Sequence, residues 1–445
     1  MSSVLRPSPR HPSGLPGAWG HRVGLRGRIA SGEGLILLVA VGLGLGVRVT
    51  YVLATRHLPL AGDELEYDAE GWLIAHGHLF WTRLPYGVLH AGAWKPPGYP
   101  AWVGLLYALG GHHPLIVRLV QVPLGALTIG LAWLLARRLF SPRVAGAAAV
   151  AVALYPLAFQ YEELLYAEAL ATPLTLLILL VALSRPPTRW RSVLCGGLLG
   201  IILLIRPSCA YLLLALLAAW IVSGGWRRGL GLTAIAALVA ALVVAPWTVR
   251  NELVLHGFLP IALDDAAGYG TFNAQSAHDR SFPYAWRPDP PSAGAVLHPR
   301  RPLSDMVLHA RLTRLTLSYI EAHPQAVPAA FFWNGLSRLW DVRRRSRALA
   351  EVPFEGRSPT LARLGLDAYY LFLPLALLGL WRLRRRRALL AGLTAMALGA
   401  SLVYTADSGT RYRATLEPVI AVLACVGVLG GGVAHRADAP GDLRA

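Results

Sequence analysis

The sequence predicts an all-α polytopic membrane protein, a bundle of about ten (roughly 9 to 12) transmembrane helices with short interfacial helices in its outer loops. Two observations support this fold class. Hydrophobic residues make up 55% of the 445 residues and charged residues only 15%, whereas about a quarter of an average soluble domain is charged. In addition, many apolar runs approach the roughly 20 residues that a helix needs to cross a bilayer core of about 30 Å.

The arginines between the apolar runs predict the orientation, because basic residues concentrate in cytoplasmic loops. Arg22, Arg26 and Arg28 precede the first run and are expected to hold the N-terminus in the cytoplasm. The spans that satisfy this and the later arginine clusters lie near residues 34–54, 115–136, 144–160, 164–183, 192–206, 208–223, 229–248, 361–381, 388–405 and 413–433. Both termini are therefore expected in the cytoplasm and the protein in the plasma (inner) membrane.

The pattern of apolar runs and arginine clusters divides the chain into parts with different expected positions relative to the membrane. We expect a disordered cytoplasmic tail (1–30), an N-terminal transmembrane module (31–249) that includes an outer loop (55–97), a large extracytoplasmic loop (250–360), C-terminal transmembrane helices (361–433) and a second cytoplasmic tail (434–445).

Two apolar segments are too short to cross a bilayer as helices. Residues 97–110 are interpreted as a short or partly inserted helix, and Pro328 to Trp340 as an interfacial amphipathic helix.

The net charge of +18 could indicate a nucleic-acid partner, but the basic residues sit between apolar runs and are not interleaved with aromatic ones. Nucleic-acid binding is therefore not expected, and membrane lipids are the expected partners of the basic loops. The three cysteines lie inside apolar runs and show neither a disulfide framework nor a thiolate metal pattern.

An acidic stretch follows the first predicted span. Five carboxylates fall between Asp63 and Glu70, with Glu64 and Tyr67 among the residues of this stretch. Clustered carboxylates repel, so at least one should have a raised pKa unless a cation or metal neutralises the group. Such a group suits a general base that takes a proton from a hydroxyl, or oxygen ligands for a divalent cation. The alternative is a solvated charged turn.

Lys95 is the only lysine of the chain and stands in the segment Trp94 to Pro100. The prolines that follow it limit the backbone and present the ammonium group from a rigid turn. That group could hold a phosphate or pair with the acidic stretch. The alternative is an incidental lysine at the membrane interface.

Several other charged residues fall at the predicted outer ends of spans, where the orientation rule does not explain them. They are Glu162, Glu163, Glu168, Arg206, Arg250, Arg411 and Arg413. Carboxylates at membrane depth are costly and indicate function, and guanidinium groups bind phosphate oxygens in pairs. These arginines therefore predict a lipid-phosphate site, with extension toward lipid headgroups as the alternative. Arg48, inside the first span, is expected to extend toward headgroups.

The order of several short motifs resembles the membrane glycosyltransferases of the GT-C fold, and most closely the branch that contains protein O-mannosyltransferases and the lipid A aminoarabinose transferase (glycosyltransferase family 39). The motifs are Asp63-Glu64 with Tyr67, Lys95 to Pro100, Ala136 to Phe140, Tyr155-Pro156 followed by Glu168, Leu204 to Pro207, Ala245 to Asn251, Glu321 to Pro324, and Arg411 to Arg413.

The resemblance implies a GT-C-like bundle and a hexosyl- or pentosyltransferase that uses a polyprenyl-phosphate sugar donor on the extracytoplasmic face. By family role, Asp63 and its neighbour Glu64 are the expected catalytic carboxylates, and Lys95 the donor-phosphate contact. The expected phosphate-binding arginines are Arg206, Arg250, Arg411 and Arg413, and the possible acceptor or metal shell is Tyr67, Glu168 and Glu162.

The resemblance leaves the sugar and the acceptor (protein, lipid or glycan) open. It makes a divalent cation possible but requires no cofactor. The alternative function is a transporter or flippase of a lipid-linked sugar, which should carry ionisable residues near the middle of the membrane and paired broken helices.

Overall fold

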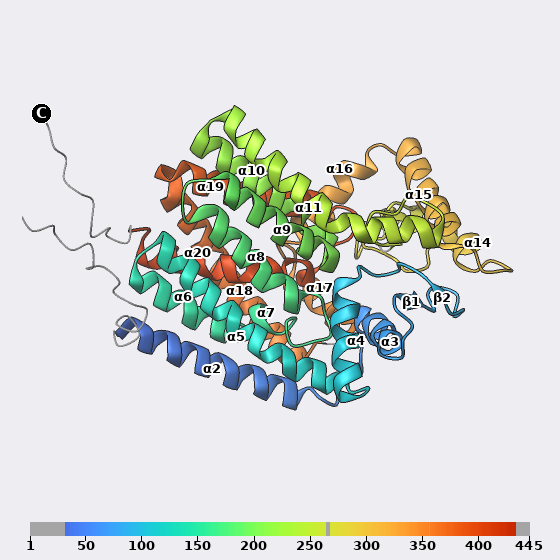
Figure 1. The fold of residues 1–445 in the computed structure, drawn as a ribbon, viewed down its shortest axis with the longest axis horizontal. Coiled ribbons are helices and arrows are strands. Elements are labelled where there is room, and N and C mark those ends of the chain that lie inside the picture. The colour runs from blue at the N-terminus through green and yellow to red at the C-terminus, as the bar shows by residue number, and fades with distance from the viewer. Residues whose placement is uncertain (1–31, 264–267, 356, 433–445) are drawn as a thin grey trace, which may run out of the picture.

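The computed structural model describes residues 32–263, 268–355 and 357–432. These residues form a bundle of long helices with a layer of short elements at one end (Figure 1). The bundle consists of α2 (Gly32–Ala54), α5 (Pro114–Leu139), α6 (Pro142–Leu154), α8 (Glu168–Leu183), α9 (Arg189–Ile205), α10 (Tyr211–Gly224), α11 (Trp226–Leu255), α18 (Pro359–Arg382), α19 (Arg387–Val403) and α20 (Glu417–Leu429). The tails predicted at 1–30 and 434–445 lie outside the described residues.

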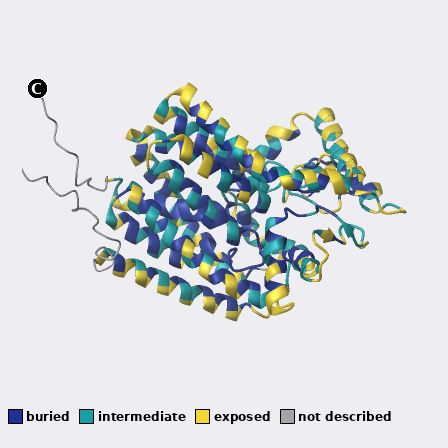
Figure 2. Cartoon of the chain, in the orientation of Figure 1, coloured by how far each residue is buried: buried dark blue, intermediate teal, exposed yellow. Residues whose placement is uncertain are grey.

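The apolar runs form helices because a backbone in hydrocarbon must satisfy its hydrogen bonds within the segment. Each predicted span overlaps a bundle helix, although the span predicted at 144–160 is divided at Tyr155 into α6 and a short turn, Pro156–Phe159. In the described part of the chain six helices are long and apolar enough to cross a membrane. Large apolar side chains remain exposed on the outside of the bundle, such as Leu38 (60%), Leu242 (63%) and Leu371 (61%), along the yellow stripes of Figure 2. A surface of this kind suits a lipid solvent.

The layer at the end of the bundle consists of short helices and one hairpin. Its elements are α3 (Asp63–Ala75), β1 (Trp81–Thr82), β2 (His90–Ala91), α4 (Gly98–Gly110), α12 (Gly268–Thr271), α13 (Ala274–His278), η3 (Pro291–Ala293), α14 (Gly294–Leu297), α15 (Asp305–Ala322), α16 (Ala326–Ala330), η4 (Phe331–Arg338), α17 (Arg345–Ala350) and η5 (Val352–Glu355). The strands β1 and β2 are antiparallel, with Trp81 opposite Ala91. Shorter turns within the bundle are α7 (Pro156–Phe159), η1 (Pro207–Ala210), η6 (Leu383–Arg385) and η7 (Thr410–Leu416).

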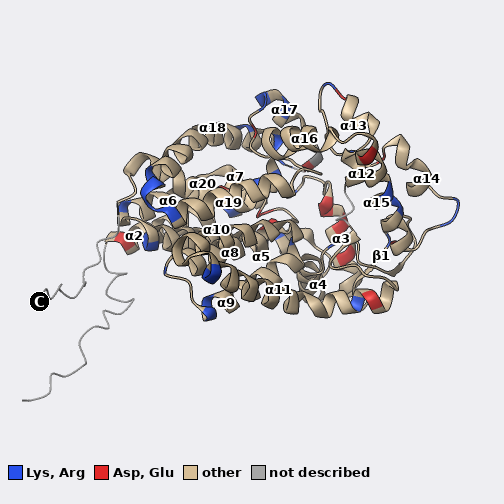
Figure 3. Ribbon diagram, turned by 90° about the horizontal axis from the view of Figure 1, so that it is seen from above, with Lys and Arg blue, Asp and Glu red and all other residues tan. Residues whose placement is uncertain are grey.

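Basic residues gather at the end of the bundle where α2 begins, and charged residues of both signs lie at the other end. At the first end, Arg137 Nε lies 2.9 Å from Glu33 Oε2, and ribbons of the neighbouring helices are partly blue in Figure 3. At the other end lie α3, whose ribbon is partly red, and α17, whose ribbon is partly blue (Figure 3). The acidic stretch and the basic helix ends are thus separated by the length of the bundle.

The segment predicted to be a short helix at 97–110 is α4, whose 13 residues span about 20 Å, less than a bilayer core. It packs on α3, where a Cβ on Gly104 would lie 2.6 Å from Ile74 Cγ2. The predicted interfacial helix at 328–340 is also helical, but it runs from α16 into a π-helix, η4. Its sequence does not reveal this wider winding.

The helices α18 and α20 approach each other at two glycines. A Cβ on Gly427 would overlap the backbone oxygen of Leu375, and one on Gly379 would overlap that of Leu423. Small residues at a helix interface permit this close backbone approach in membranes.

We therefore expect Gly427→Ala to lower the stability of the bundle by about 1–3 kcal/mol, because the two helices must separate to admit a methyl group. The matched control is Gly46→Ala in α2, where a Cβ would meet no atom within 4 Å. Thermal unfolding of the purified protein in detergent measures both. Equal unfolding temperatures for the two variants would contradict the close packing.

Candidate functional site

Helix α3 begins at a glycine and presents its acidic residues at its first turn. Gly62 precedes the helix with φ 57°, a left-handed conformation that glycine adopts without strain. Asp63, Glu64 and Glu66 stand in the first turn, where the positive end of the helix dipole favours carboxylates. Because residues three apart share a helix face, Asp63 and Glu66 lie on the same side of α3.

Lys95 reaches that side of α3 from the segment between the hairpin and α4. Its Nζ lies 3.0 Å from Asp63 Oδ1 and 2.7 Å from Glu66 Oε2, and only 3% of the residue is exposed. The ammonium group also stands 5.6 Å from the ring centre of Tyr67. The indole of Trp94 donates a 3.2 Å hydrogen bond to Glu66. The single lysine is thus held between two carboxylates.

Arg411 approaches Asp63 from the opposite end of the chain. Its Nη2 lies 2.6 Å from Asp63 Oδ2, and its Nε lies 3.4 Å from Glu168 Oε1. That same carboxylate oxygen lies 2.5 Å from Arg206 Nη1. The guanidinium of Arg411 faces the rings of Tyr166 and Tyr412, at 4.5 and 4.9 Å from their centres.

These residues form one group that we call the charged cluster, and it comprises Asp63, Glu66, Lys95, Glu168, Arg206 and Arg411. Three carboxylates balance three cations. The side chain of Asp63 is 29% exposed and that of Glu66 28%, whereas those of Lys95 and Arg411 are 2% and 10% exposed. The α3 carboxylates therefore face outward and the cations lie behind them.

The two neighbouring carboxylates at the start of α3 have opposite electrostatic environments. Burial acts to raise the pKa of Asp63, but the charges of Arg411 and Lys95 outweigh it and lower that pKa well below its ordinary value. Burial raises the pKa of Glu64, although the backbone N–H groups of Leu165 and Ala61 donate to it. The expected raised pKa thus falls on Glu64, and cations neutralise Asp63.

Glu64 and Tyr67 are buried, and of the two only the Tyr67 ring contacts a cation, that of Lys95. The Glu64 carboxylate ties the start of α3 to the loop between α7 and α8 through Leu165. Tyr67 packs edge-on against Tyr99, with ring centres 4.7 Å apart. Both residues support the position of α3.

Arg250 and Arg413 were expected to join the phosphate-binding arginines, but the structure gives them other partners. Arg250 donates to the backbone oxygens of Gly92 and Phe80, at 2.6 and 3.0 Å, and so holds the base of the hairpin that leads to Lys95. Arg413 is fully buried and pairs with Glu417 at 2.7 Å. These contacts join it to the bundle core.

Glu162 lies in a second, fully buried network. Its Oε2 stands 3.4 Å from Arg48 Nη2, and Thr128 donates to it at 3.1 Å. The expectation that Arg48 extends to headgroups is therefore wrong: the residue is 0% exposed because Glu162 and Glu163 supply carboxylates inside the bundle.

Sequence patterns pointed to most of the charged cluster but missed several of its contacts. Glu66 was seen only as part of the acidic stretch, although its spacing from Asp63 places both on one helix face. Tyr166 and Tyr412 lie beside predicted residues, and nothing in their spacing indicates that their rings face Arg411.

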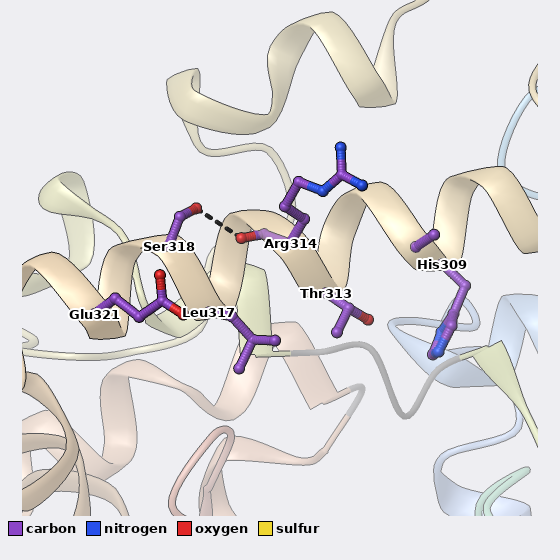
Figure 4. A pocket seen from close by; sticks show the side chains of 7 residues that line it. His309, Thr313, Arg314, Leu317, Ser318 and Glu321 are labelled. Atoms are coloured by element: carbon purple, nitrogen blue, oxygen red, sulfur yellow. Dashed lines mark hydrogen bonds between the residues drawn. The ribbon is translucent and has the colours of Figure 1, made fainter.

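For the divalent cation that the resemblance makes possible, no group of three or more His, Cys, Asp or Glu in the described residues is placed to hold a metal ion. A hollow of about 370 Å³ lies elsewhere, along one face of α15. Figure 4 shows His309, Thr313 and Leu317 on this face. The hollow contains none of the residues of the charged cluster.

Comparisons with known proteins were made for sequence and structure. A family model described as dolichyl-phosphate-mannose-protein mannosyltransferase matches residues 94–249. A search of curated proteins gave no match. The archaeal oligosaccharyltransferase AglB from Archaeoglobus fulgidus, solved with an inhibitory peptide and a dolichol-phosphate, is similar with a TM-score of 0.53 and 15% identity. The match covers 89% of this chain and 50% of that one, so the chain spans about half the length of the oligosaccharyltransferase.

A second solved structure, ArnT from Cupriavidus metallidurans in the apo state, is 17% identical, and the match covers 88% of this chain and 77% of that one with a TM-score of 0.37. The likeness to AglB shows the fold of this chain, which is the GT-C fold expected from its motifs.

The hairpin beside Lys95 contains a pH-sensitive contact. His90 Nε2 lies 2.9 Å from Asp305 Oδ1, and this hydrogen bond raises the pKa of His90 above its ordinary value of 6.5 despite partial burial. A raised folded-state pKa means that the stabilising contribution is complete below pH 6.5 and is lost as the pH rises through the folded value.

We expect His90→Asn to lower the unfolding temperature relative to the unsubstituted protein at about pH 5.5, and much less at about pH 8.5. Thermal unfolding at the two pH values measures the difference. A decrease in unfolding temperature that is equal at both pH values, or greater at about pH 8.5, would show that the charged imidazole of His90 does not stabilise the hairpin.

Proposed function

We propose that the chain is an integral-membrane glycosyltransferase that moves a sugar from a polyprenyl-phosphate donor to a hydroxyl acceptor on the extracytoplasmic face. The observation that carries this proposal is the charged cluster, in which a partly exposed carboxylate, Asp63, contacts Lys95 and Arg411. Transfer of a sugar from a phosphate to a hydroxyl needs a base for the hydroxyl proton and cations for the phosphate charge, and this cluster contains both kinds of group.

The chemistry requires a proton acceptor and a site for negative charge. The acceptor oxygen forms a bond to the anomeric carbon while the bond from that carbon to the phosphate oxygen breaks. Asp63 takes the hydroxyl proton as a general base. Lys95 and Arg411 stabilise the charge that develops on the leaving polyprenyl phosphate, as preorganised cations do in a site that excludes much of the water.

The comparisons support the donor class and the fold on which the site stands. The family model of mannosyltransferases that use dolichyl phosphate mannose includes Lys95, Glu168 and Arg206 within its matched residues. The similar archaeal oligosaccharyltransferase was solved with dolichol-phosphate. A polyprenyl phosphate is therefore the donor carrier proposed for this chain, and the basic helix ends far from α3 favour an extracytoplasmic site.

The proposal is tested with purified protein, radiolabelled polyprenyl-phosphate sugars and membrane extract as the source of acceptor. We expect labelled sugar to appear on an acceptor in the presence of protein. Movement of an intact lipid-linked sugar across vesicle membranes, without transfer, would instead identify a transporter or flippase.

Asp63→Asn should reduce transfer by about 100- to 10,000-fold, because general-base catalysis contributes a factor of about this size. The matched control is Asp68→Asn on the same helix, since Asp68 binds Tyr107 and His112 and none of the cations of the cluster. Initial rates at equal protein levels measure both variants. Full turnover by Asp63→Asn would remove Asp63 from the mechanism.

A further inference from the structure

The charged cluster contains a conflict between the state of Asp63 and the role proposed for it. Both of its oxygens are engaged, Oδ1 by Lys95 and Oδ2 by Arg411. A carboxylate that two cations hold in this way attracts a proton poorly. It must lose at least part of these contacts before it can accept the proton of a hydroxyl.

The cations, in contrast, have other partners that can keep them in place. Arg411 remains in contact with Glu168 and between the rings of Tyr166 and Tyr412. Lys95 remains in contact with Glu66 at 2.7 Å. Asp63 is the partly exposed carboxylate that contacts both Lys95 and Arg411, and its departure leaves two positioned donors behind it.

We propose that Asp63 fills the anion position on Lys95 and Arg411 while the donor is absent, and that the donor phosphate displaces it from these cations. This inference rests on the proposed function and adds to it a means of keeping the base inactive until the donor is bound. Lys95 and Arg411 then form one anion-binding site, for which Asp63 and the donor phosphate compete.

The charge balance of the transfer agrees with such an exchange. Before transfer, Asp63 carries one negative charge and the phosphodiester of the donor carries one. When the acceptor proton moves to Asp63 and the bond between the anomeric carbon and the phosphate oxygen breaks, the carboxyl group becomes neutral. The electron pair of that bond remains on the phosphate, which gains a negative charge.

One unit of negative charge therefore moves from Asp63 to the phosphate, while the total within the site is unchanged. Lys95 and Arg411, which contact the phosphate after the exchange and stand beside Asp63, stabilise the charge that the phosphate gains without large movement, and preorganisation of that kind favours the transition state. Arg206 pairs with Glu168 and not with Asp63. The contacts of Glu168 with Arg206 and Arg411 are therefore kept during the exchange.

Competition between Asp63 and the phosphate makes a prediction that a phosphate site without such competition does not. Removal of the charge of Asp63 should tighten the binding of a phosphate, although it abolishes transfer. We expect Asp63→Asn in the purified full-length chain to bind undecaprenyl phosphate about tenfold more tightly than the unsubstituted protein, the factor that corresponds to about 1.4 kcal/mol. Binding is measured by quenching of intrinsic tryptophan fluorescence in detergent micelles.

Two further variants separate the exchange from a general effect of charge. Glu66→Gln removes a carboxylate from Lys95 alone, and Asp68→Asn removes one from the same helix without contact to the cations. Both are expected to change the affinity by less than about threefold. Asp63→Ser replaces Asp63→Asn in the comparison if the latter does not give a monodisperse protein.

Each outcome decides between the proposals. Tighter binding that is specific to position 63 supports the exchange. Equal or weaker binding at position 63, or an equal gain with Glu66→Gln, overturns the exchange but leaves the proposed function intact. Absence of undecaprenyl phosphate binding in every variant overturns the exchange together with the polyprenyl-phosphate donor of the proposed function.

Discussion

The contact of Asp63 with Lys95 on one side and Arg411 on the other connects parts of the chain that are far apart in sequence. Asp63 and Arg411 are separated by 348 positions, and Lys95 arrives from the segment that follows the hairpin. Three charged groups at partly buried positions stabilise one another only when all are present, since an unpaired buried charge is costly. The fold of the outer layer therefore depends on the start of α3, the segment before α4 and η7 meeting at one place.

Two kinds of packing in the bundle surround the site where Asp63, Lys95 and Arg411 meet. Glycines at 379 and 427 let α18 and α20 approach closely, and η7, which carries Arg411, leads directly into α20. On the other side, the buried pairs of Arg48 with Glu162 and Glu163 hold the loop before α8, and this loop carries Glu168 into the cluster. Carboxylates at membrane depth thus have two roles here, one structural at Glu162 and one in the cluster at Glu168.

The sequence predicted the helices well because a long apolar run has few alternatives in a membrane, and each predicted span falls on a helix. Glu168, Arg206 and Arg411 were predicted as site residues because charges at the outer ends of spans need a reason to be there. Asp63 was predicted from the acidic stretch, and Lys95 from its proline-flanked segment, both with the family resemblance. The destinations of Arg48, Arg250 and Arg413 were not predictable in the same way. Their side chains turn toward partners from other helices, and residue spacing along one helix carries no information about those partners.

The most direct measurement is an experimental structure of the chain with undecaprenyl phosphate bound. We expect phosphate oxygens within hydrogen-bond distance of Lys95 Nζ and of the Arg411 guanidinium, with the Asp63 carboxylate withdrawn from at least one of these cations. A phosphate bound elsewhere, with both contacts of Asp63 unchanged, would contradict it.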